Sequence, residues 1–435
     1  MERKTLENSK ESRDHAVLVG LRSPVLGDDS ADEESLMELS ELVDTAGGDT
    51  AGIILQSREK PDPHSFIGEG KVEEVKRMVD NEQATMVIFD NDLSPSQIRV
   101  LTELLGVQVI DRSGLILDIF AQRARTKEGC LQVELAQYQY LLPRLIGMWS
   151  HLERQGGTSG KGPIGSKGPG ETQLETDRRH IRRKIDKLKA ELEEVRRVRA
   201  TQRQRRSKNE IPVVAIVGYT NAGKSTLLNA ITGADIPANN RLFDTLDTTT
   251  RLLTVSDTLD VVISDTVGFI RKLPHQLVEA FKATLEELEY ADLLLHVIDS
   301  SNLQWRQQAD TVDRLIRELG ADTIPCIRVY NKSDLSFPGD RAKEEDAVAI
   351  SAKTGEGIPD LLALIDKKLD KGTKRVTLHL PYDKAGALDS LYREAKVESV
   401  EYAATVDVVA VCNPRLLGQL KDYIEGWQPP KEEWE

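Results

Sequence analysis

The sequence predicts an α/β protein in four consecutive parts, since its 435 residues exceed a single ordinary domain. Strand-like and helix-like segments alternate in the first part, two apolar seams with helical spacing follow, and short polar motifs then end several strand candidates. We therefore expect an N-terminal α/β domain at 1–113, a helical hairpin at 114–209, a domain with a mostly parallel sheet at 210–371 and a small α+β module at 372–435.

The first part alternates apolar strand candidates with amphipathic helix candidates. Strands are expected at His15–Leu21, Gly52–Gln56, Thr85–Asp90 and Val107–Ile110, and helices at Ser30–Leu42, Gly70–Met78 and Ser94–Leu105. This alternation predicts a small domain with a parallel sheet. Its glycine-rich segment Gly68-Glu69-Gly70-Lys71 lacks the spacing of a phosphate loop, so a plain turn is favoured over a second nucleotide site.

The second part carries two apolar seams with steps of three and four residues. The first seam is Leu131, Leu135, Tyr138 and Leu142, and the second is Ile181, Ile185, Leu188, Leu192, Val195 and Val198. Such spacing is typical of amphipathic helices that pack with near-heptad register. Two such helices joined by a loop predict an antiparallel hairpin, with the glycine-rich segment Gly156–Gly170 at its tip.

Charge is distributed unevenly along the chain. The net charge is −14, yet residues 151–208 hold 17 Lys and Arg against 8 Asp and Glu. An acidic protein with one basic arm is expected to touch a polyanion at that arm. The chain has no apolar segment long enough to span a bilayer and no signal-peptide core near Met1, which indicates a cytoplasmic protein.

A phosphate loop follows the strand candidate Val213–Val217. The loop reads Gly218, Tyr219, Thr220, Asn221, Ala222, Gly223, Lys224 and Ser225, and a helix candidate, Thr226–Ile231, comes next. This is G-x-x-x-x-G-K-S in the required strand-loop-helix context, where backbone N–H groups can surround a diphosphate. Lys224 is expected to reach the β and γ phosphates, and the Ser225 hydroxyl is a suitable oxygen ligand for Mg²⁺.

A second motif follows the strand candidate Val261–Ser264. It is Asp265, Thr266, Val267 and Gly268, the D-x-x-G pattern. Asp265 is expected to hold Mg²⁺ through water, and the Gly268 N–H to sense the γ phosphate. The residue after this glycine is Phe269, although a glutamine there orients the attacking water in small GTPases. We therefore expect slow hydrolysis unless a partner completes or orders the site.

Two further motifs predict selection of guanine. The strand candidate Ile327–Tyr330 leads to Asn331, Lys332, Ser333 and Asp334, and Ala349–Ile350 leads to Ser351, Ala352 and Lys353. A carboxylate at 334 can accept hydrogen bonds from N1–H and the exocyclic amine of guanine, a donor pair that adenine lacks. Polar groups left unpaired by the wrong base would disfavour ATP. The four motifs in this order predict a P-loop GTPase domain with GTP as substrate.

A threonine between the P-loop and Asp265 is expected to provide another Mg²⁺ ligand. The segment contains Phe243, Asp244, Thr245, Leu246 and Asp247, followed by three further threonines. Composition leaves Thr245, Thr248 and Thr249 as alternatives for the ligand.

The chain resembles the HflX family of ribosome-associated GTPases along nearly all of its length. The most specific segments are HLERQGG at 151–157 and GPGETQLETDRR at 168–179. Residues 243–247 resemble the family's F-A-T-L-D, with Asp244 in place of alanine, and this resemblance assigns the Mg²⁺ ligand to Thr245. The hydrophobic Phe269 also resembles the family. Lys224, Thr245 and Gly268 are then the residues expected to act on the transferred phosphate.

The resemblance implies a partner, the large ribosomal subunit and its rRNA, rather than DNA. It implies nucleotide-dependent binding by a protein that is monomeric on the ribosome, and a role in splitting stalled ribosomes or in ribosome biogenesis. The glycine-rich tip and basic face would contact RNA, as both features suit an irregular polyanion. Candidate RNA contacts are Arg154, Lys161, Lys167, Arg178, Arg179, Arg182 and Arg183.

Two other functions compete with this one. In the first, the chain is a regulatory GTPase whose hairpin binds a protein partner without RNA. In the second, it is an ATP-dependent nucleic-acid enzyme, which the guanine-type motif at Asn331–Asp334 disfavours.

Overall fold

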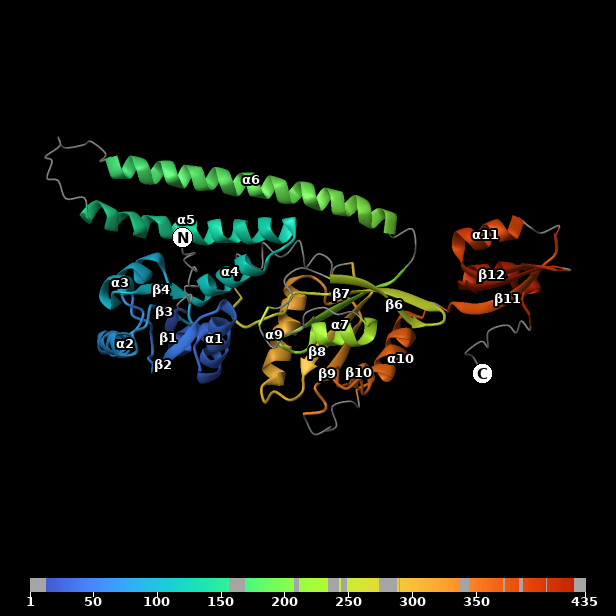
Figure 1. Ribbon diagram of the computed structural model, residues 1–435, viewed down its shortest axis with the longest axis horizontal. Coiled ribbons are helices and arrows are strands. Elements are labelled where there is room, and N and C mark those ends of the chain that lie inside the picture. The colour runs from blue at the N-terminus through green and yellow to red at the C-terminus, as the bar shows by residue number, and fades with distance from the viewer. Residues whose placement is uncertain are drawn as a thin grey trace, which may run out of the picture.

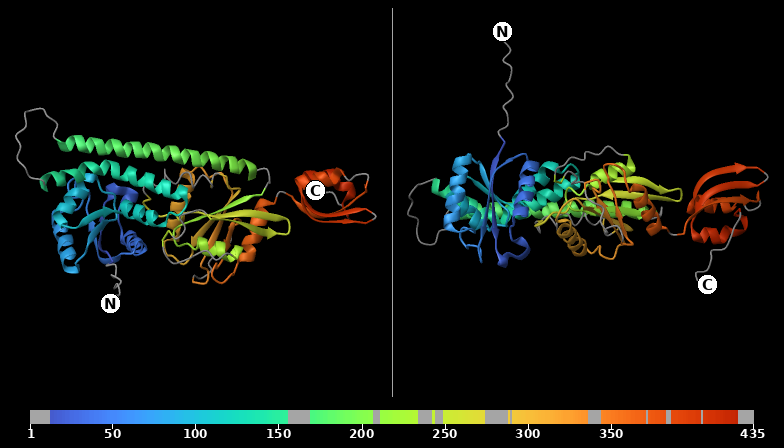
Figure 2. Two further views of the ribbon diagram at one scale, coloured as in Figure 1. Left: turned by 45° about the horizontal axis from the view of Figure 1, so that its top comes forward. Right: turned by 90° about the horizontal axis from the view of Figure 1, so that it is seen from below.

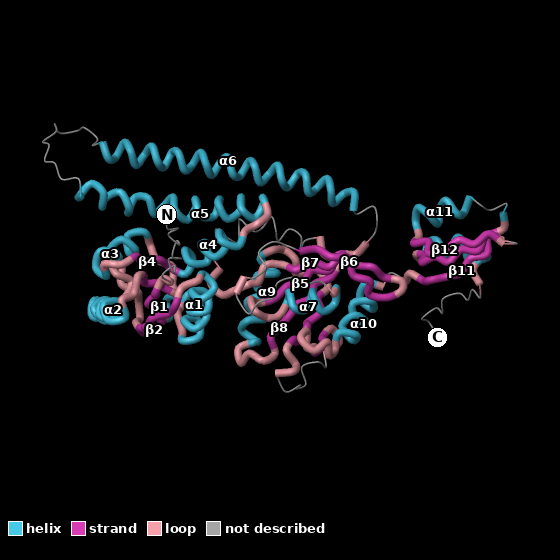
Figure 3. Tube along the Cα trace, in the orientation of Figure 1, coloured by secondary structure: helices cyan, strands magenta, loops and turns pink. Residues whose placement is uncertain are grey.

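The computed structural model describes residues 13–155, 169–206, 211–233, 242–243, 249–273, 288, 290–335, 344–370, 372–382, 386–403 and 405–425. Within these residues the chain forms three sheets, which follow one another along the long axis of the molecule (Figure 1). A pair of long helices, α5 and α6, lies over the first sheet and extends along the same axis. The α/β class predicted from the sequence is confirmed, since helices and strands are mixed within each of the sheet-containing parts (Figure 3).

The N-terminal domain is built on a parallel sheet of order β2-β1-β3-β4. Its strands are β1 (His15–Arg22), β2 (Asp49–Ser57), β3 (Met86–Phe89) and β4 (Gln108–Asp111). The helices between them are α1 (Glu33–Ala46), α2 (Glu69–Glu82) and α3 (Pro95–Leu105), and a short 3-10 helix, η1 (Pro24–Asp29), precedes α1. The apolar face of α1 packs on one side of the sheet, whereas α2 and α3 cover the other. All seven predicted elements are confirmed, but the segment Gly68–Lys71 is the N-cap and first turn of α2 rather than a plain turn.

A fourth helix, α4 (Arg112–Arg123), follows β4 directly and was not predicted. Asp111 caps it by accepting a hydrogen bond from the Gly114 N–H at 2.9 Å. Leu115, Ile116, Ile119 and Phe120 are buried in the same core as α1. A helix buried on most of its sides lacks the clear apolar stripe that reveals a surface helix, so its period is hard to detect in the sequence. The domain boundary expected at residue 113 falls inside this helix.

The hairpin consists of α5 (Lys127–Gln155) and α6 (Pro169–Arg206), which lie side by side in Figure 1 and in the left view of Figure 2. Both predicted seams meet in one apolar cluster that includes Leu131, Leu135, Ile185 and Leu188. Val198 is the exception, because 51% of its surface is exposed. The physical reason is length: α6 runs on past the start of α5, so its last turns lie beyond the helix with which it pairs (Figure 1). The glycine-rich tip at 156–168 lies outside the described residues.

The central domain has a sheet of order β10-β9-β8-β5-β7-β6. The strands are β5 (Val213–Gly218), β6 (Thr249–Ser256), β7 (Leu259–Asp265), β8 (Leu293–Asp299), β9 (Cys326–Asn331) and β10 (Ala347–Ala349). All neighbours are parallel except β6, which pairs antiparallel with β7. Helices α7 (Lys224–Thr232) and α10 (Ile358–Leu369) cover one face, and α9 (Trp305–Glu318) covers the other. The mostly parallel sheet is as predicted.

The C-terminal module is an antiparallel sheet of order β11-β13-β12 with two helices on one face. It contains β11 (Lys374–Leu380), α11 (Gly386–Glu394), β12 (Lys396–Tyr402), β13 (Val406–Cys412), α12 (Pro414–Leu420) and a 3-10 turn, η5 (Lys421–Tyr423). The strand β12 was not predicted. It is mostly exposed and polar, so it lacks the apolar run by which strands are recognised. In the described part of the chain, every helix is too short or too polar to cross a lipid bilayer.

The hairpin seam provides a stability prediction. Leu188 is 2% exposed within the α5–α6 cluster, so Leu188→Ala should destabilise the hairpin by about 2–4 kcal/mol through the cavity it leaves. The control is Val198→Ala on the same helix, which should change stability by less than about 0.5 kcal/mol. The loss of hydrogen-exchange protection at the α5 and α6 amides measures the destabilisation of the hairpin in each variant. Equal loss of protection in the two variants would contradict this packing.

Candidate functional site

Four loops meet at one edge of the central sheet. They follow β5, β7, β9 and β10, which run parallel, so their carboxyl ends lie at the same edge. The loop after β5 is the P-loop, residues 218–225, and the loop after β7 begins switch II, residues 268–273. The loops after β9 and β10 carry the sequences NKSD and SAK at 331–334 and 351–353. The sequence motifs are therefore brought together in space.

Two glycines of the P-loop allow close approaches that a side chain would block. A Cβ at Gly218 would lie 2.3 Å from the Val297 carbonyl oxygen on β8, and one at Gly223 would lie 2.3 Å from Asn331 Nδ2. Gly223 also has a φ of 93°, a left-handed conformation that precedes the first turn of α7. The loop therefore leaves β5 sharply and delivers Lys224 and Ser225 to the amino end of α7, where backbone N–H groups favour an anion.

Lys224 is buried at the centre of the site. Its Nζ donates a hydrogen bond to the Tyr219 carbonyl oxygen at 2.8 Å. Burial lowers the pKa of Lys224 to about 8, and the nearby Asp265 carboxylate opposes this shift only in part. A second negative charge nearby, such as a phosphate, would therefore strongly stabilise the buried ammonium group.

A hydroxyl and a carboxylate meet beside Lys224. Ser225 Oγ donates to Asp265 Oδ2 at 2.7 Å, and Asp265 is fully buried at the end of β7. These are hard oxygen donors of the kind that Mg²⁺ prefers, so the residues fit that ion. Thr245, the third expected ligand, lies outside the described residues, as do Asp244, Leu246 and Asp247.

Switch II begins against the P-loop. The Thr220 N–H donates to the Phe269 carbonyl at 2.8 Å, and the Phe269 N–H donates to the Gly218 carbonyl at 3.1 Å. A Cβ at Gly268 would lie 2.9 Å from Thr220 Cγ2 and 3.0 Å from Lys224 Nζ, so glycine is needed at this close approach. In the two residues that lead from β7 to switch II, Thr266 Oγ1 donates to the Ile216 carbonyl on β5 at 2.7 Å, and Val267 is buried.

Asn331 joins three of the four loops through its buried amide. Its Nδ2 donates to the Ala222 carbonyl in the P-loop at 2.9 Å, and its Oδ1 accepts from the Ala352 N–H at 2.9 Å. The hydrogen bond to Ala222 braces the P-loop against the end of β9. The Ala352 N–H already donates to Asn331 and is therefore not free to donate to a ligand in this arrangement.

Two further residues of the NKSD motif, Lys332 and Asp334, are held by hydrogen bonds. Ser351 Oγ donates to Asp334 Oδ1 at 2.7 Å and so orients that carboxylate, which is exposed. Lys332 Nζ donates to Asp299 Oδ2 at 2.7 Å, at the end of β8. Lys353 is also exposed. An exposed carboxylate with one fixed oxygen is suited to accept hydrogen bonds from a ligand that enters from solvent.

The N-terminal domain touches this site, which the sequence motifs did not indicate. Phe243 is buried against Phe120 of α4, with ring centroids 4.6 Å apart, and the Tyr219 hydroxyl donates to Glu38 of α1. Neither Phe120 nor Glu38 belongs to a motif with recognisable spacing. Contacts between residues so distant in the chain leave no local pattern, so only the folded arrangement reveals them.

Four family models match consecutive parts of the chain. A GTP-binding GTPase N-terminal model matches residues 33–121, and a GTP-binding GTPase middle-region model matches 123–206. A model described as 50S ribosome-binding GTPase matches 213–332, and an HflX C-terminal domain model matches 339–409.

Curated relatives match over most of their length. A protein named GTPase HflX from Caldanaerobacter subterraneus subsp. tengcongensis is 49% identical over 392 residues, which cover 90% of this chain and 89% of that protein. The GTPase HflX of Escherichia coli K12 is 46% identical over 373 residues, or 84% and 86% of the two chains. A solved GTP-binding protein of Sulfolobus solfataricus in complex with GDP is 25% identical, covering 82% of this chain and 98% of that one, with a TM-score of 0.43.

The role of Asn331 gives a prediction for the free protein. Asn331→Ala removes two hydrogen bonds and leaves the Ala222 carbonyl and the Ala352 N–H without them, which should cost roughly 2–4 kcal/mol. Urea unfolding of the central domain without added nucleotide measures the change. Asn302→Ala, at an exposed asparagine after β8, is the control and should cost less than about 1 kcal/mol. Equal costs would show that Asn331 does not brace the loops.

Proposed function

The chain belongs to the HflX family of GTPases, and on this premise we propose that it binds the large ribosomal subunit when GTP occupies its nucleotide site. Hydrolysis of GTP to GDP and phosphate would then release it. The bound protein would act as a cytoplasmic monomer that splits stalled ribosomes or assists ribosome biogenesis. The 50S ribosome-binding GTPase model that matches the central domain supports the choice of partner.

The P-loop is proposed to hold the phosphates of GTP. Its backbone N–H groups and the amino end of α7 would surround the β phosphate, and Lys224 would reach the β and γ phosphates. The support is geometric and electrostatic. Gly218 and Gly223 shape a loop that admits close backbone approach, and the Lys224 ammonium is buried near the Asp265 carboxylate.

The motifs after β9 and β10 are proposed to select guanine. Asp334 would accept the N1–H and the exocyclic amine, and the stem of Lys332 would pack on the ring. Since the Ala352 N–H already donates to Asn331 Oδ1, we assign the Lys353 N–H to guanine O6. The orientation of Asp334 by Ser351 supports this role, because one fixed carboxylate can discriminate a base that presents two donors.

The hydrolytic step transfers the γ phosphoryl group to water and yields GDP and phosphate. Lys224 and the Gly268 N–H would stabilise negative charge on the transferred group, which is the main task in phosphoryl transfer. Ser225, Thr245 and, through water, Asp265 would hold Mg²⁺, which neutralises phosphate charge when bound. Phe269 has no hydrogen-bonding side chain to orient water. The proposal is therefore slow turnover, on the order of 10⁻⁴–10⁻² s⁻¹, until a partner supplies what is missing.

The observation that carries the ribosome proposal is the basic outer face of α6. Arg179, Arg182 and Arg183 are exposed on the side of α6 away from the seam residues Ile181 and Ile185. The long hairpin holds this face at the end of the molecule away from the C-terminal module (Figure 1). Cationic side chains on a rigid projecting arm suit contact with RNA phosphates. Lys161, Lys167 and the side chain of Arg154, also expected to contact RNA, lie outside the described residues.

Sedimentation with purified ribosomal subunits tests this proposal. The chain should co-sediment with large subunits in a non-hydrolysable GTP analogue and much less in GDP. Reversing Arg179, Arg182 and Arg183 to glutamate should weaken binding at least about tenfold and reduce its salt dependence. Release of separate subunits from intact ribosomes would indicate splitting rather than biogenesis.

The matched control reverses three exposed lysines remote from the hairpin, Lys367, Lys368 and Lys374. This control should bind within about twofold of the unchanged chain, because the change in net charge is the same. If the hairpin variant sediments as well as the control, RNA contact by α6 is wrong and a hairpin that binds a protein partner becomes the better account. If neither nucleotide state supports sedimentation, the ribosome proposal fails altogether.

The lowered pKa of Lys224 gives a pH prediction. In the free protein, the Lys224 side chain is mostly a charged ammonium below about pH 8 and mostly a neutral amine above about pH 8. Bound phosphate favours the charged form, so binding above pH about 8 should take up as much as one proton, and affinity should fall as pH rises, by up to tenfold per unit. Calorimetry of GDP binding in two buffers of different ionisation enthalpy, at about pH 7 and about pH 9, measures the uptake.

Lys224→Arg is the control for proton uptake by other groups, since a guanidinium stays charged throughout this range. Its uptake at about pH 9 should be smaller than that of the unchanged chain by up to one proton. Identical uptake by the two proteins would show that Lys224 does not change its protonation when nucleotide binds.

A further inference from the structure

The side chain of Tyr219, the second residue of the P-loop, leaves the loop toward the N-terminal domain. It is buried, with 4% of its surface exposed. Its hydroxyl donates to Glu38 Oε1 on α1 at 2.5 Å and accepts from the backbone N–H of Arg271 in switch II at 2.9 Å. One hydroxyl group thus connects the P-loop, switch II and the N-terminal domain.

The backbone of Tyr219 is equally engaged. Its carbonyl oxygen accepts the hydrogen bond from Lys224 Nζ, and it pairs with Phe269 in an isolated parallel bridge. The carbonyl therefore contacts the P-loop lysine, whereas the backbone bridge and the phenol both contact the segment that starts switch II. A change at the hydroxyl can reach Gly268 through Arg271, which is only three residues away.

Glu38, the acceptor of the Tyr219 hydroxyl, is itself fixed by buried charges. Its second carboxylate oxygen accepts from Arg112 Nη2, and Arg112 Nη1 donates to Asp90 Oδ1 at 2.8 Å. The other Asp90 oxygen accepts from Ser35 Oγ at 2.8 Å and from Lys272 Nζ of switch II. The chain of contacts thus starts at the P-loop, passes through the N-terminal domain and returns to the residue after Arg271.

Asp90 and Arg112 lie where parallel α/β domains commonly bind ligands. They follow the carboxyl ends of β3 and β4, next to the start of α1. Here the Lys272 ammonium occupies that position and pairs with Asp90, and both side chains are buried. Burial alone would raise the pKa of Asp90, but Arg112 and Lys272 outweigh it and hold the pKa below its ordinary value. The carboxylate is therefore ionised and the contact is a charged one.

Burial and the neighbouring Glu38 carboxylate raise the pKa of Tyr219 well above its ordinary value. The phenol is therefore protonated throughout the neutral range and must donate one hydrogen bond. Because the phenol uses its one O–H to donate a hydrogen bond to Glu38, its oxygen can only accept the hydrogen bond from the Arg271 N–H. The direction of both hydrogen bonds is fixed by this chemistry.

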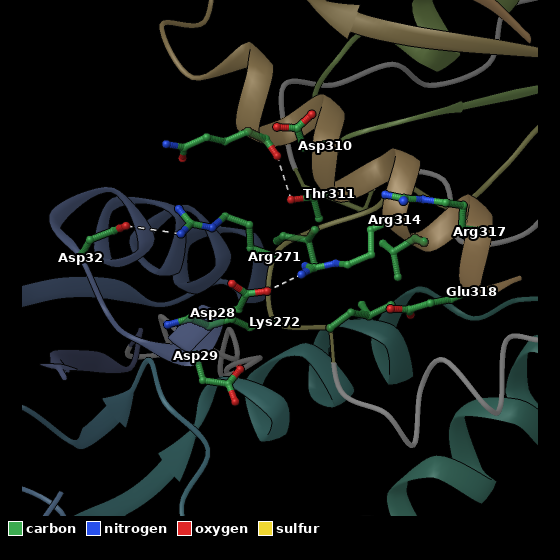
Figure 4. A pocket seen from close by; sticks show the side chains of 14 residues that line it. Asp28, Asp29, Asp32, Arg271, Lys272, Asp310, Thr311, Arg314, Arg317 and Glu318 are labelled. Atoms are coloured by element: carbon green, nitrogen blue, oxygen red, sulfur yellow. Dashed lines mark hydrogen bonds and ion pairs between the residues drawn. The ribbon is translucent and has the colours of Figure 1, made fainter. Parts of the chain in front are cut away.

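The surroundings of switch II make these contacts more important. A cavity of about 660 Å³ separates η1 and α9 beside switch II, and Figure 4 shows Arg271 directed toward Asp32 and Arg314 toward Asp28 across it. Arg271 also lines a second cavity of about 390 Å³ on the P-loop side, between α1 and the loop after β8. Arg271 thus lies between two open spaces, whereas the preceding Phe269 and Ile270 are buried in the core, so polar contacts act together with packing to fix this segment.

We propose that Tyr219 is a positioning residue for GTP hydrolysis: its hydroxyl, held by Glu38 of the N-terminal domain, fixes the switch II backbone so that the Gly268 N–H faces the γ phosphate. Transition-state stabilisation depends on donors that are already in place when charge develops. GDP has no γ phosphate, so its binding does not use this donor. The loss of the hydroxyl therefore affects turnover more than the binding of GDP.

Tyr219→Phe is the direct test, on the isolated full-length chain and without ribosomes. The variant keeps the ring and the carbonyl that accepts from Lys224 but removes the hydroxyl. Single-turnover GTP hydrolysis should slow roughly 3- to 10-fold, in line with one lost hydrogen bond. The dissociation constant for a fluorescent GDP analogue should stay within about twofold. This split between the hydrolysis rate and GDP affinity is what a merely structural role would not produce.

The matched control is Tyr140→Phe. Tyr140 is another largely buried tyrosine, and its hydroxyl donates to the Asp111 carboxylate at 2.7 Å, remote from the nucleotide site. This control should lose comparable thermal stability, but its hydrolysis rate should stay within about twofold of the unchanged chain. A Tyr219→Phe rate that is unchanged or faster, or an equal slowing in both variants, would overturn the proposal.

A second pair of variants tests the N-terminal half of the contact. Glu38→Gln keeps an oxygen acceptor for the Tyr219 hydroxyl, whereas Glu38→Ala removes it. Hydrolysis should therefore be slower in Glu38→Ala than in Glu38→Gln by roughly threefold or more. This pair also decides the matter if Tyr219→Phe fails to bind GDP, and equal rates in the two Glu38 variants would contradict the proposal.

Discussion

The amide of Asn331 is the interaction on which the nucleotide site depends. It occupies the space left by the absent side chain of Gly223, donates to the P-loop at Ala222 and accepts from the loop after β10 at Ala352. The four motifs lie far apart in the chain, and parallel strands bring them only to a common edge. This one buried side chain fixes the P-loop, the loop after β9 and the loop after β10 relative to one another.

The sequence predicts what is local and repetitive. The P-loop was recognisable because one octapeptide carries both its glycines and its charge, and the hairpin because its seams repeat at helical spacing. The contact between Tyr219 and Glu38 was not, since 181 positions separate the two residues and neither has a patterned neighbour. The charged cluster of Asp90, Arg112 and Lys272 could not be predicted from the sequence for the same reason. The helix α4 was not predicted because it is buried on most sides and so has no distinct apolar stripe in its sequence.

The N-terminal domain connects the hairpin to the nucleotide site. Asp111, at the end of β4, accepts from the Tyr140 hydroxyl at 2.7 Å and from Arg144 Nη2 at 2.8 Å, both on α5. On its other side the domain holds switch II through Asp90 and the P-loop through Glu38. Polar contacts thus extend from α5 to Asp111, and from the adjoining Arg112 to Asp90, Glu38 and switch II. This arrangement agrees with a GTPase whose turnover waits for a partner.

The central claim is that Asp334, oriented by Ser351, shares one pocket with Lys224 and selects guanine. Titration calorimetry of the purified chain with GTP and with ATP tests it most directly. The account predicts that GTP binds at least about a hundredfold more tightly, because adenine would leave the carboxylate without the donors it requires. Equal affinity for the two nucleotides, or no binding of either, would contradict the claim.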